Sequence, residues 1–99
     1  MQFTIIARDY KDSDALSRRM AARQAHIELS NQAKEKGEHL FGVAMLNEEG
    51  QMCGSIMVVN LPSRKEVAAW LAIEPYITGK VWEHIEVIPC KIGPSFAAP

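Results

Sequence analysis

The chain has 99 residues and a formal net charge of −1 at pH 7, from 11 basic and 12 acidic side chains. This length fits one domain, and the near balance of charge argues against a nucleic-acid-binding protein, which would carry a clear basic excess. No apolar run approaches the roughly 20 residues that cross a bilayer, and the start of the chain lacks the pattern of a secretory signal. We therefore expect a cytoplasmic protein that binds no membrane, with one domain over residues 1–99, a core over about residues 2–92 and a tail over 93–99.

The first half of the chain predicts a strand, a long helix and a hairpin. Residues 3–8 are β-rich, and residues 15–36 favour a helix because they contain no glycine or proline and end before Gly37. Residues 39–46 and 51–61 predict two strands joined by a turn over 47–50. The predicted buried stripe of the helix consists of Ala15, Arg19, Ala22, His26, Leu29 and Ala33.

The second half predicts another helix and a fourth strand. The helix is expected over residues 63–73, where Ser63 caps it and Glu66 completes a capping box. Pro75 then ends the helix, and residues 76–79 are expected to form an irregular turn. Residues 83–92 alternate as a strand, with Ile85 and Val87 on one face. The order βαββαβ predicts a ferredoxin-like α+β fold, a four-stranded antiparallel sheet with both helices on one face and the first strand between the third and fourth.

This topology also bears on the two cysteines. Cys53 and Cys90 would lie two strand spacings apart, about 9–10 Å, which is too far for a disulfide. The three histidines have no close spacing with either cysteine, so we expect packed thiols rather than a metal site, and no cofactor.

The third strand is apolar on both faces, although the helices cover only one face of the predicted sheet. An open apolar face of this size is typical of an interface. We therefore expect a homodimer with its sheets face to face, with Met57, Val59 and Ile88 near the contact, although the sequence leaves open which strand parity faces the partner. The tail residue Phe96 is expected to lie across the partner or the dimer edge.

An ordered set of short motifs runs along the chain. Arg23 and His26 stand in the long helix, Gly54-Ser55 lies in a strand, Ala69-Trp70 lies in the second helix, and Glu74-Pro75-Tyr76 precedes the last strand. This succession resembles the YciI-related (YCII domain) family over nearly the whole chain. The resemblance implies a dimeric α+β barrel, a group that also holds muconolactone isomerase-type enzymes and small monooxygenases.

The resemblance further implies that His26 and Glu74 form an active-site pair, with Arg23 and Ser55 as neighbours in the pocket. The chain departs from the usual family pattern at two places. Glu74 stands where aspartate is usual, which adds one methylene to the reach of the carboxylate. The segment Gly42-Val43-Ala44 stands where many members carry a Gly-Pro pair.

The residues themselves support this pairing. His26 lies on the buried stripe, where a neutral imidazole needs a partner for its N–H. Pro75 would hold Glu74 at the end of the second helix with its carboxylate turned toward His26, an arrangement that supports a general base. The alternatives are a hydrogen-bonded core histidine and a plain helix stop. Tyr76 is a candidate substrate-binding residue, although packing around the pocket explains it equally well.

Two functions follow from these residues. The first is a small cofactor-independent isomerase or lyase, in which His26 and Glu74 move a proton on a small cyclic or aromatic-derived acid. Arg19 and Arg23 border the buried stripe and can hold the carboxylate of such a ligand. The second is a non-enzymatic metabolite-binding or regulatory dimer that uses the same pocket.

Overall fold

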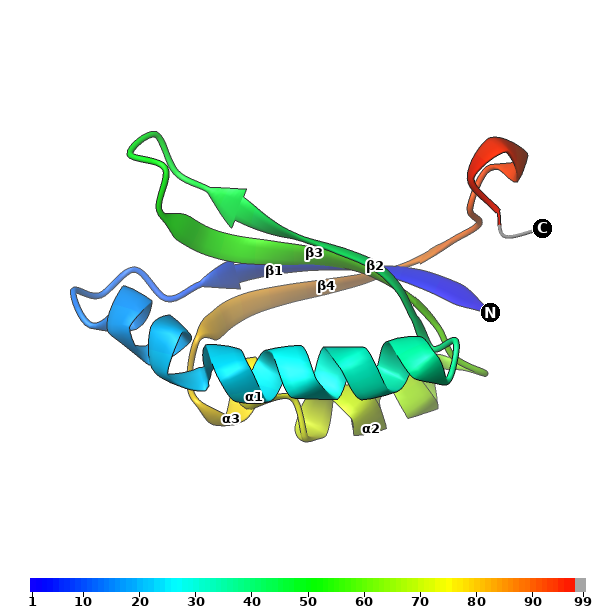
Figure 1. The fold of residues 1–99 in the computed structure, drawn as a ribbon, viewed down its shortest axis with the longest axis horizontal. Helices are drawn as coiled ribbons and strands as arrows, with labels where there is room; N and C mark the ends of the chain where they lie inside the picture. Colours follow the sequence, from blue (N-terminus) through cyan, green and yellow to red (C-terminus); the bar gives the residue numbers. More distant parts are fainter. Residues whose placement is uncertain (98–99) are drawn as a thin grey trace.

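The fold is a four-stranded antiparallel sheet with three helices on one face (Figure 1). The computed structural model describes residues 1–97. The strand order is β2-β3-β1-β4, so the prediction that the first strand lies between the third and fourth is confirmed. The elements in chain order are β1 (Gln2–Asp9), α1 (Ala15–Glu35), β2 (His39–Leu46), β3 (Met52–Asn60), α2 (Arg64–Ala72), α3 (Pro75–Thr78), β4 (Trp82–Cys90) and the 3-10 turn η1 (Pro94–Phe96).

The ends of α1 and α2 follow from their capping residues. After α1, Gly37 has a φ of +73°, a conformation that side chains disfavour. Its N–H donates to the carbonyl of Lys34, and the N–H of Glu38 donates to the carbonyl of Ala33, which together make a Schellman motif. At the start of α2, the hydroxyl of Ser63 accepts from the N–H of Lys65 at 3.2 Å, as its predicted capping role requires.

The segment after α2 differs from the sequence-based expectation. An irregular turn was predicted over residues 76–79, but Pro75–Thr78 forms a helical turn, α3. Glu74 caps this turn because its side chain accepts from the N–H of Tyr76 at 3.1 Å, and Pro75 stands at the first helical position, which its fixed φ suits. Pro75 therefore ends one helix and begins the next, with Glu74 held between them.

The hydrophobic core lies between the sheet and the helices. The helix-facing side chains of β1 are Phe3, Ile5 and Ala7, and Ile5 pairs across the sheet with Met57. Met57 and Val59 are 2% and 1% exposed, so the expectation that they lie near a dimer contact is wrong. The reason is visible in β1, whose other parity carries Gln2, Thr4 and Arg8, so the parity of Phe3, Ile5 and Ala7 takes the core and carries its β3 partners with it.

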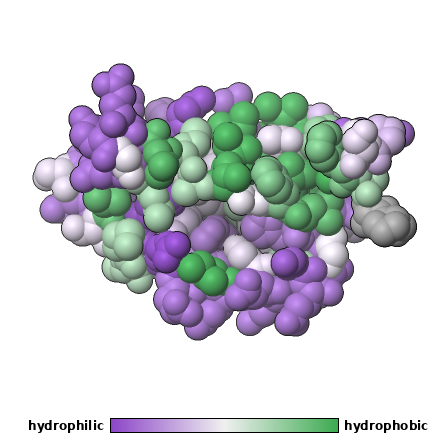
Figure 2. Space-filling model, turned by 45° about the horizontal axis from the view of Figure 1, so that its top comes forward, coloured by the Kyte–Doolittle hydropathy of each residue, from purple (hydrophilic) through white to green (hydrophobic). Residues whose placement is uncertain are grey.

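The opposite face of the sheet carries no helix. Figure 2 shows apolar side chains gathered over the sheet side of the molecule, above a hydrophilic band on the helix side. Phe41, Val43 and Ile88 are 57%, 44% and 42% exposed. The register places them on the same face as Ile56 and Val58. This set of five side chains is called the open apolar face below.

The remaining predictions about the chain concern its cysteines and its tail. Both cysteines are free, on strands β3 and β4 with β1 between them, as the spacing argument predicted. Phe96 is 85% exposed, and Figure 1 shows η1 on the side of the sheet that faces away from the helices. Residues 98 and 99 of the predicted tail lie outside the described residues. None of the described helices is long and apolar enough to cross a membrane.

Candidate functional site

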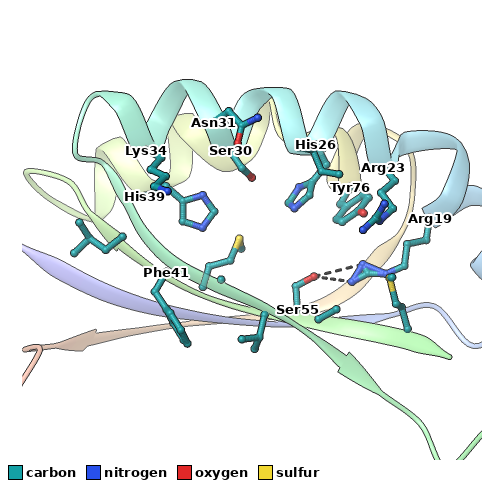
Figure 3. Close-up of a pocket in the computed structure, with 17 residues that line it drawn as sticks. Arg19, Arg23, His26, Ser30, Asn31, Lys34, His39, Phe41, Ser55 and Tyr76 are labelled. Carbon is teal, nitrogen blue, oxygen red and sulfur yellow. Dashed lines mark hydrogen bonds between the residues drawn. The ribbon is translucent and has the colours of Figure 1, made fainter. Parts of the chain in front are cut away.

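A cavity of about 360 Å³ lies between α1 and the β2 side of the sheet. Figure 3 shows side chains from α1 and the strands converging on it, with Arg19, Arg23, His26 and Tyr76 at one end and His39 at the other. The polar lining consists of Arg19, Arg23, His26, Ser30, Asn31, Lys34, His39, Ser55 and Tyr76. Every residue that sequence analysis proposed for the site, except Glu74, therefore lines this cavity.

His26 and Glu74 form a hydrogen-bonded pair. Nδ1 of His26 lies 2.6 Å from Oε1 of Glu74, so the predicted approach of these two side chains is confirmed. Glu74 is fully buried and lies behind the imidazole, away from the cavity wall. Oε1 also accepts from the backbone N–H of Tyr76. Because Oε1 acts as an acceptor, Nδ1 of His26 is the donor in its contact with Glu74. The lone pair of the neutral imidazole is then on Nε2.

Tyr76 holds the imidazole from a second direction. Its ring stacks on His26 with a centroid separation of 4.0 Å and an interplanar angle of 11°. The guanidinium of Arg19 lies over the same tyrosine ring at 4.6 Å. Burial raises the pKa of the Tyr76 hydroxyl. Trp82 meets both rings edge-on, at 6.0 Å from His26 and 5.5 Å from Tyr76, so these aromatics fix the plane of the imidazole.

Arg19 is the most deeply buried of the charged side chains that line the cavity. It is 1% exposed, and Nη2 donates to Oγ of Ser55 at 2.7 Å and to the carbonyl of Gly54. Its Nε lies 3.4 Å from Oδ2 of Asp9. Burial raises the pKa of the Asp9 carboxyl, and the positive charge of Arg19 opposes that rise.

Ser55 serves as an acceptor in this cluster. Its hydroxyl oxygen receives bonds from Arg19 and from Nε1 of Trp82 at 3.3 Å. These contacts match a role in positioning Arg19 rather than nucleophilic chemistry, which needs an adjacent base. Arg23 is exposed and lines the cavity without a hydrogen bond among residues 1–97. A ligand anion in the cavity would therefore meet the buried, hydrogen-bonded guanidinium of Arg19 and the exposed guanidinium of Arg23.

His39 lines the far end of the cavity, and sequence analysis missed it. The imidazole is 9% exposed and meets the Trp70 ring edge-on at 5.8 Å. Burial lowers the pKa of His39, and the nearby His26 lowers it further. A β-bulge explains the omission, because His39 and Phe41 pair with the adjacent residues Val59 and Val58 of β3. Regular alternation would have placed His39 and Phe41 on the same face.

The donor set of the cavity suits acid–base chemistry. In the part of the chain that the structure describes, no three His, Cys, Asp or Glu side chains lie together as metal ligands would. The polar groups instead comprise an imidazole with an oriented lone pair and two guanidinium groups beside it. Such a site can remove a proton and stabilise the negative charge that results.

Fold and site together define a ferredoxin-like α+β fold in which a histidine at the wall of a cationic cavity pairs with a buried carboxylate behind it. The chain belongs to the family of the YCII-related domain, whose model matches residues 1–91. It is 30% identical over 97 residues to Protein YciI from Escherichia coli, an alignment that covers 92% of this chain and 97% of the relative. The family suggested by the sequence motifs is thereby confirmed.

Solved structures of the same fold are more distant in sequence. The chain is 20% identical to the 5-chloro-2-hydroxyhydroquinone dehydrochlorinase from Burkholderia phenoliruptrix in complex with 2,5-dihydroxybenzoquinone, with a TM-score of 0.81 and coverage of 98% of this chain and 100% of that one. It is 14% identical to Rv0793 from Mycobacterium tuberculosis, with a TM-score of 0.57 and coverage of 95% and 99%. At these identities the likeness establishes the ferredoxin-like fold.

Proposed function

We propose that the protein is a cofactor-independent enzyme that moves a proton on a small cyclic or aromatic-derived acid. The observation that carries this proposal is the 2.6 Å contact between Nδ1 of His26 and Oε1 of Glu74 at the wall of the cavity. This contact leaves Nε2 of His26 as the proton acceptor. The buried carboxylate behind the ring stabilises the imidazolium that forms when a proton is taken.

The neighbouring cations supply the other half of the proposed reaction. When His26 takes a proton from a ligand C–H or O–H bond, the electron pair of that bond stays on the ligand as an enolate or phenolate. Arg19 and Arg23 stabilise this charge. Return of the proton to another atom gives isomerisation. In elimination, the pair left by the proton forms a new double bond, and the leaving group departs with the electron pair of its own bond. Both outcomes balance without an added oxidant or reductant.

Exchange of ligand protons with heavy water tests this reaction. Ligands are first identified by binding from a panel of small cyclic acids and dihydroxyquinones, including 2,5-dihydroxybenzoquinone, the ligand in the dehydrochlorinase structure. Proton NMR in heavy water then follows the loss of ligand C–H signals. Exchange is expected with the wild-type protein, and His26→Gln is expected to slow it by about 10²–10⁴-fold, the usual contribution of a general base.

The same experiment separates the two functions. A ligand that binds equally well to the wild-type and His26→Gln proteins and never exchanges or reacts would contradict the enzyme. That result would favour the alternative, a metabolite-binding or regulatory protein, for which the cavity and its cations are sufficient.

We also propose that two copies of the chain form a homodimer through the open apolar face. This face has no cover within one copy, and stacking two sheets about 10 Å apart would bury it. The segment η1, which contains the exposed Phe96, lies on the same side of the sheet and would reach the partner copy.

Sedimentation velocity at micromolar concentration checks this assembly. The wild-type protein should sediment as a dimer. Val58→Lys, which places a charge in the middle of the open apolar face, should raise the dissociation constant by at least about a hundredfold, because an unpaired charge is costly to bury. Gln32→Lys adds the same charge on exposed α1 and should leave the dimer unchanged. A wild-type monomer at micromolar concentration would contradict the homodimer.

A further inference from the structure

The cavity has a second polar end whose groups lack partners. Nε2 of His39 and Oγ of Ser30 are both buried, and neither makes a hydrogen bond within residues 1–97. Both residues line the cavity (Figure 3). A buried polar atom without a partner destabilises the folded state, because it has lost its hydrogen bonds to water and gained none in return. Two such atoms at one end of a cavity indicate that a bound group supplies their hydrogen bonds.

The β-bulge in β2 keeps this end open. Because the bulge shifts the alternation, Gly42, and not Phe41, is the next residue after His39 on the helix-facing side of the strand. A Cβ atom on Gly42 would lie 3.2 Å from Nε2 of His39, so the lack of a side chain on Gly42 keeps a methyl group from packing against that nitrogen. Phe41 is turned to the open apolar face, where it is 57% exposed.

We propose that His39, with Ser30 beside it, forms a second binding subsite that receives a hydroxyl group of the ligand. The carboxylate of the same ligand lies at the opposite end, near Arg19 and Arg23. The ligand class is therefore a small cyclic acid with a hydroxyl group on the far side of its ring. This inference rests on the proposed function, because it assigns the second end of the same cavity.

A hydroxyl fits the His39 end better than a second anion does. Burial and the neighbouring His26 both lower the pKa of His39, so its imidazole is neutral at neutral pH. A neutral imidazole offers one donor and one acceptor, and a hydroxyl can pair with either. The one cation in the lining near this end, Lys34, is exposed, and its charge remains hydrated. Anions are held more strongly by the buried guanidinium of Arg19.

Binding of two matched probes tests the subsite. Isothermal titration calorimetry measures the affinities of 4-hydroxybenzoate and benzoate, which share the carboxylate and differ only in the hydroxyl. The wild-type protein is expected to bind 4-hydroxybenzoate about three- to tenfold more tightly, the contribution of one hydrogen bond. His39→Phe should abolish this preference and leave the affinity for benzoate unchanged, whereas loss of a merely structural residue would weaken both probes together.

Gly42→Ala provides a second variant in case His39→Phe does not fold. Its added methyl lies against Nε2 and should also remove the preference. Equal affinities in the wild-type protein, or a preference that survives both substitutions, would overturn the subsite while leaving the cationic end and the proposed proton transfer intact. If neither probe binds, the assignment of a hydroxy acid fails, and the exchange experiment with 2,5-dihydroxybenzoquinone still decides the proposed function separately.

Discussion

Replacing Arg19 by methionine is expected to lower the free energy of unfolding by about 3–5 kcal/mol, because it leaves the buried carboxylate of Asp9 without its counter-charge. Urea denaturation followed by circular dichroism measures this change. The double variant Asp9→Asn with Arg19→Met should recover part of the loss, since no charge then remains buried. A loss in the single variant that the second substitution does not reduce would contradict the pairing.

The penalty of Arg19→Met should depend on pH. Burial raises the pKa of Asp9, and the positive charge of Arg19 opposes that rise. Loss of Arg19 therefore raises the pKa of Asp9 further. A carboxyl group whose pKa is higher in the folded than in the unfolded state stabilises the fold at low pH and loses that contribution as the pH rises. The penalty is therefore largest near neutral pH and shrinks as the pH falls toward 3.8, the ordinary value for aspartate.

Arg18→Met is the matched control for this prediction. Arg18 is the neighbour of Arg19 in sequence and also pairs with an aspartate, Asp12, at 2.7 Å. That pair is solvent-exposed, and exposed pairs contribute little to stability. Arg18→Met is therefore expected to leave the denaturation midpoint almost unchanged.

Replacing Glu74 by alanine is expected to cost about 2–4 kcal/mol, from loss of a helix cap and of the acceptor for two buried donors. Those donors are Nδ1–H of His26 and the backbone N–H of Tyr76. Glu74→Gln keeps an acceptor oxygen and should cost less. Denaturation gives the stabilities, and ¹⁵N NMR of the His26 ring should show the proton fixed on Nδ1 in the wild-type protein and shared between both nitrogens in Glu74→Ala.

Glu28→Ala controls for loss of a carboxylate elsewhere, since Glu28 is exposed on α1. It should leave both stability and the ring spectrum unchanged. If Glu74→Ala has the same stability and the same ring spectrum as the wild-type protein, then Glu74 does not orient His26 in solution.

Most of the architecture could be predicted from local patterns. The alternation of β4, Gly37 after α1 and Ser63 before α2 act within a few residues, and each has the predicted effect in the structure. The approach of His26 and Glu74 was implied by the family resemblance, and the helical stripe that turns His26 inward and the helix stop at Pro75 supported it. Each of these patterns is formed by residues close together in the sequence, so the sequence alone is enough to recognise it.

The features that sequence analysis missed depend on more distant contacts. The bulge at the start of β2 shifts the alternation of the residues that follow it, as far as a second irregularity after Met45, and the sequence of the strand gives no sign of it. For this reason, sequence analysis did not place His39 in the cavity. Asp9 stands at the end of β1, and Arg19 stands near the start of α1. Only the packing of β1 against α1 in the folded protein brings these two side chains together. The helical turn of α3 was hidden by reading Pro75 only as a stop.

The position of β2 at the edge of the sheet has an evolutionary consequence. The His26–Glu74 pair is anchored in α1 and at the start of α3, whereas Gly42 and Ala44, which also line the cavity, belong to a strand with only one neighbour. Substitutions in an edge strand disturb fewer contacts than substitutions in a central one. Homologous proteins can therefore change the shape of this wall, and with it the preferred ligand, while the His26–Glu74 pair stays intact. The departure of Gly42-Val43-Ala44 from the usual family pattern falls on this adaptable wall.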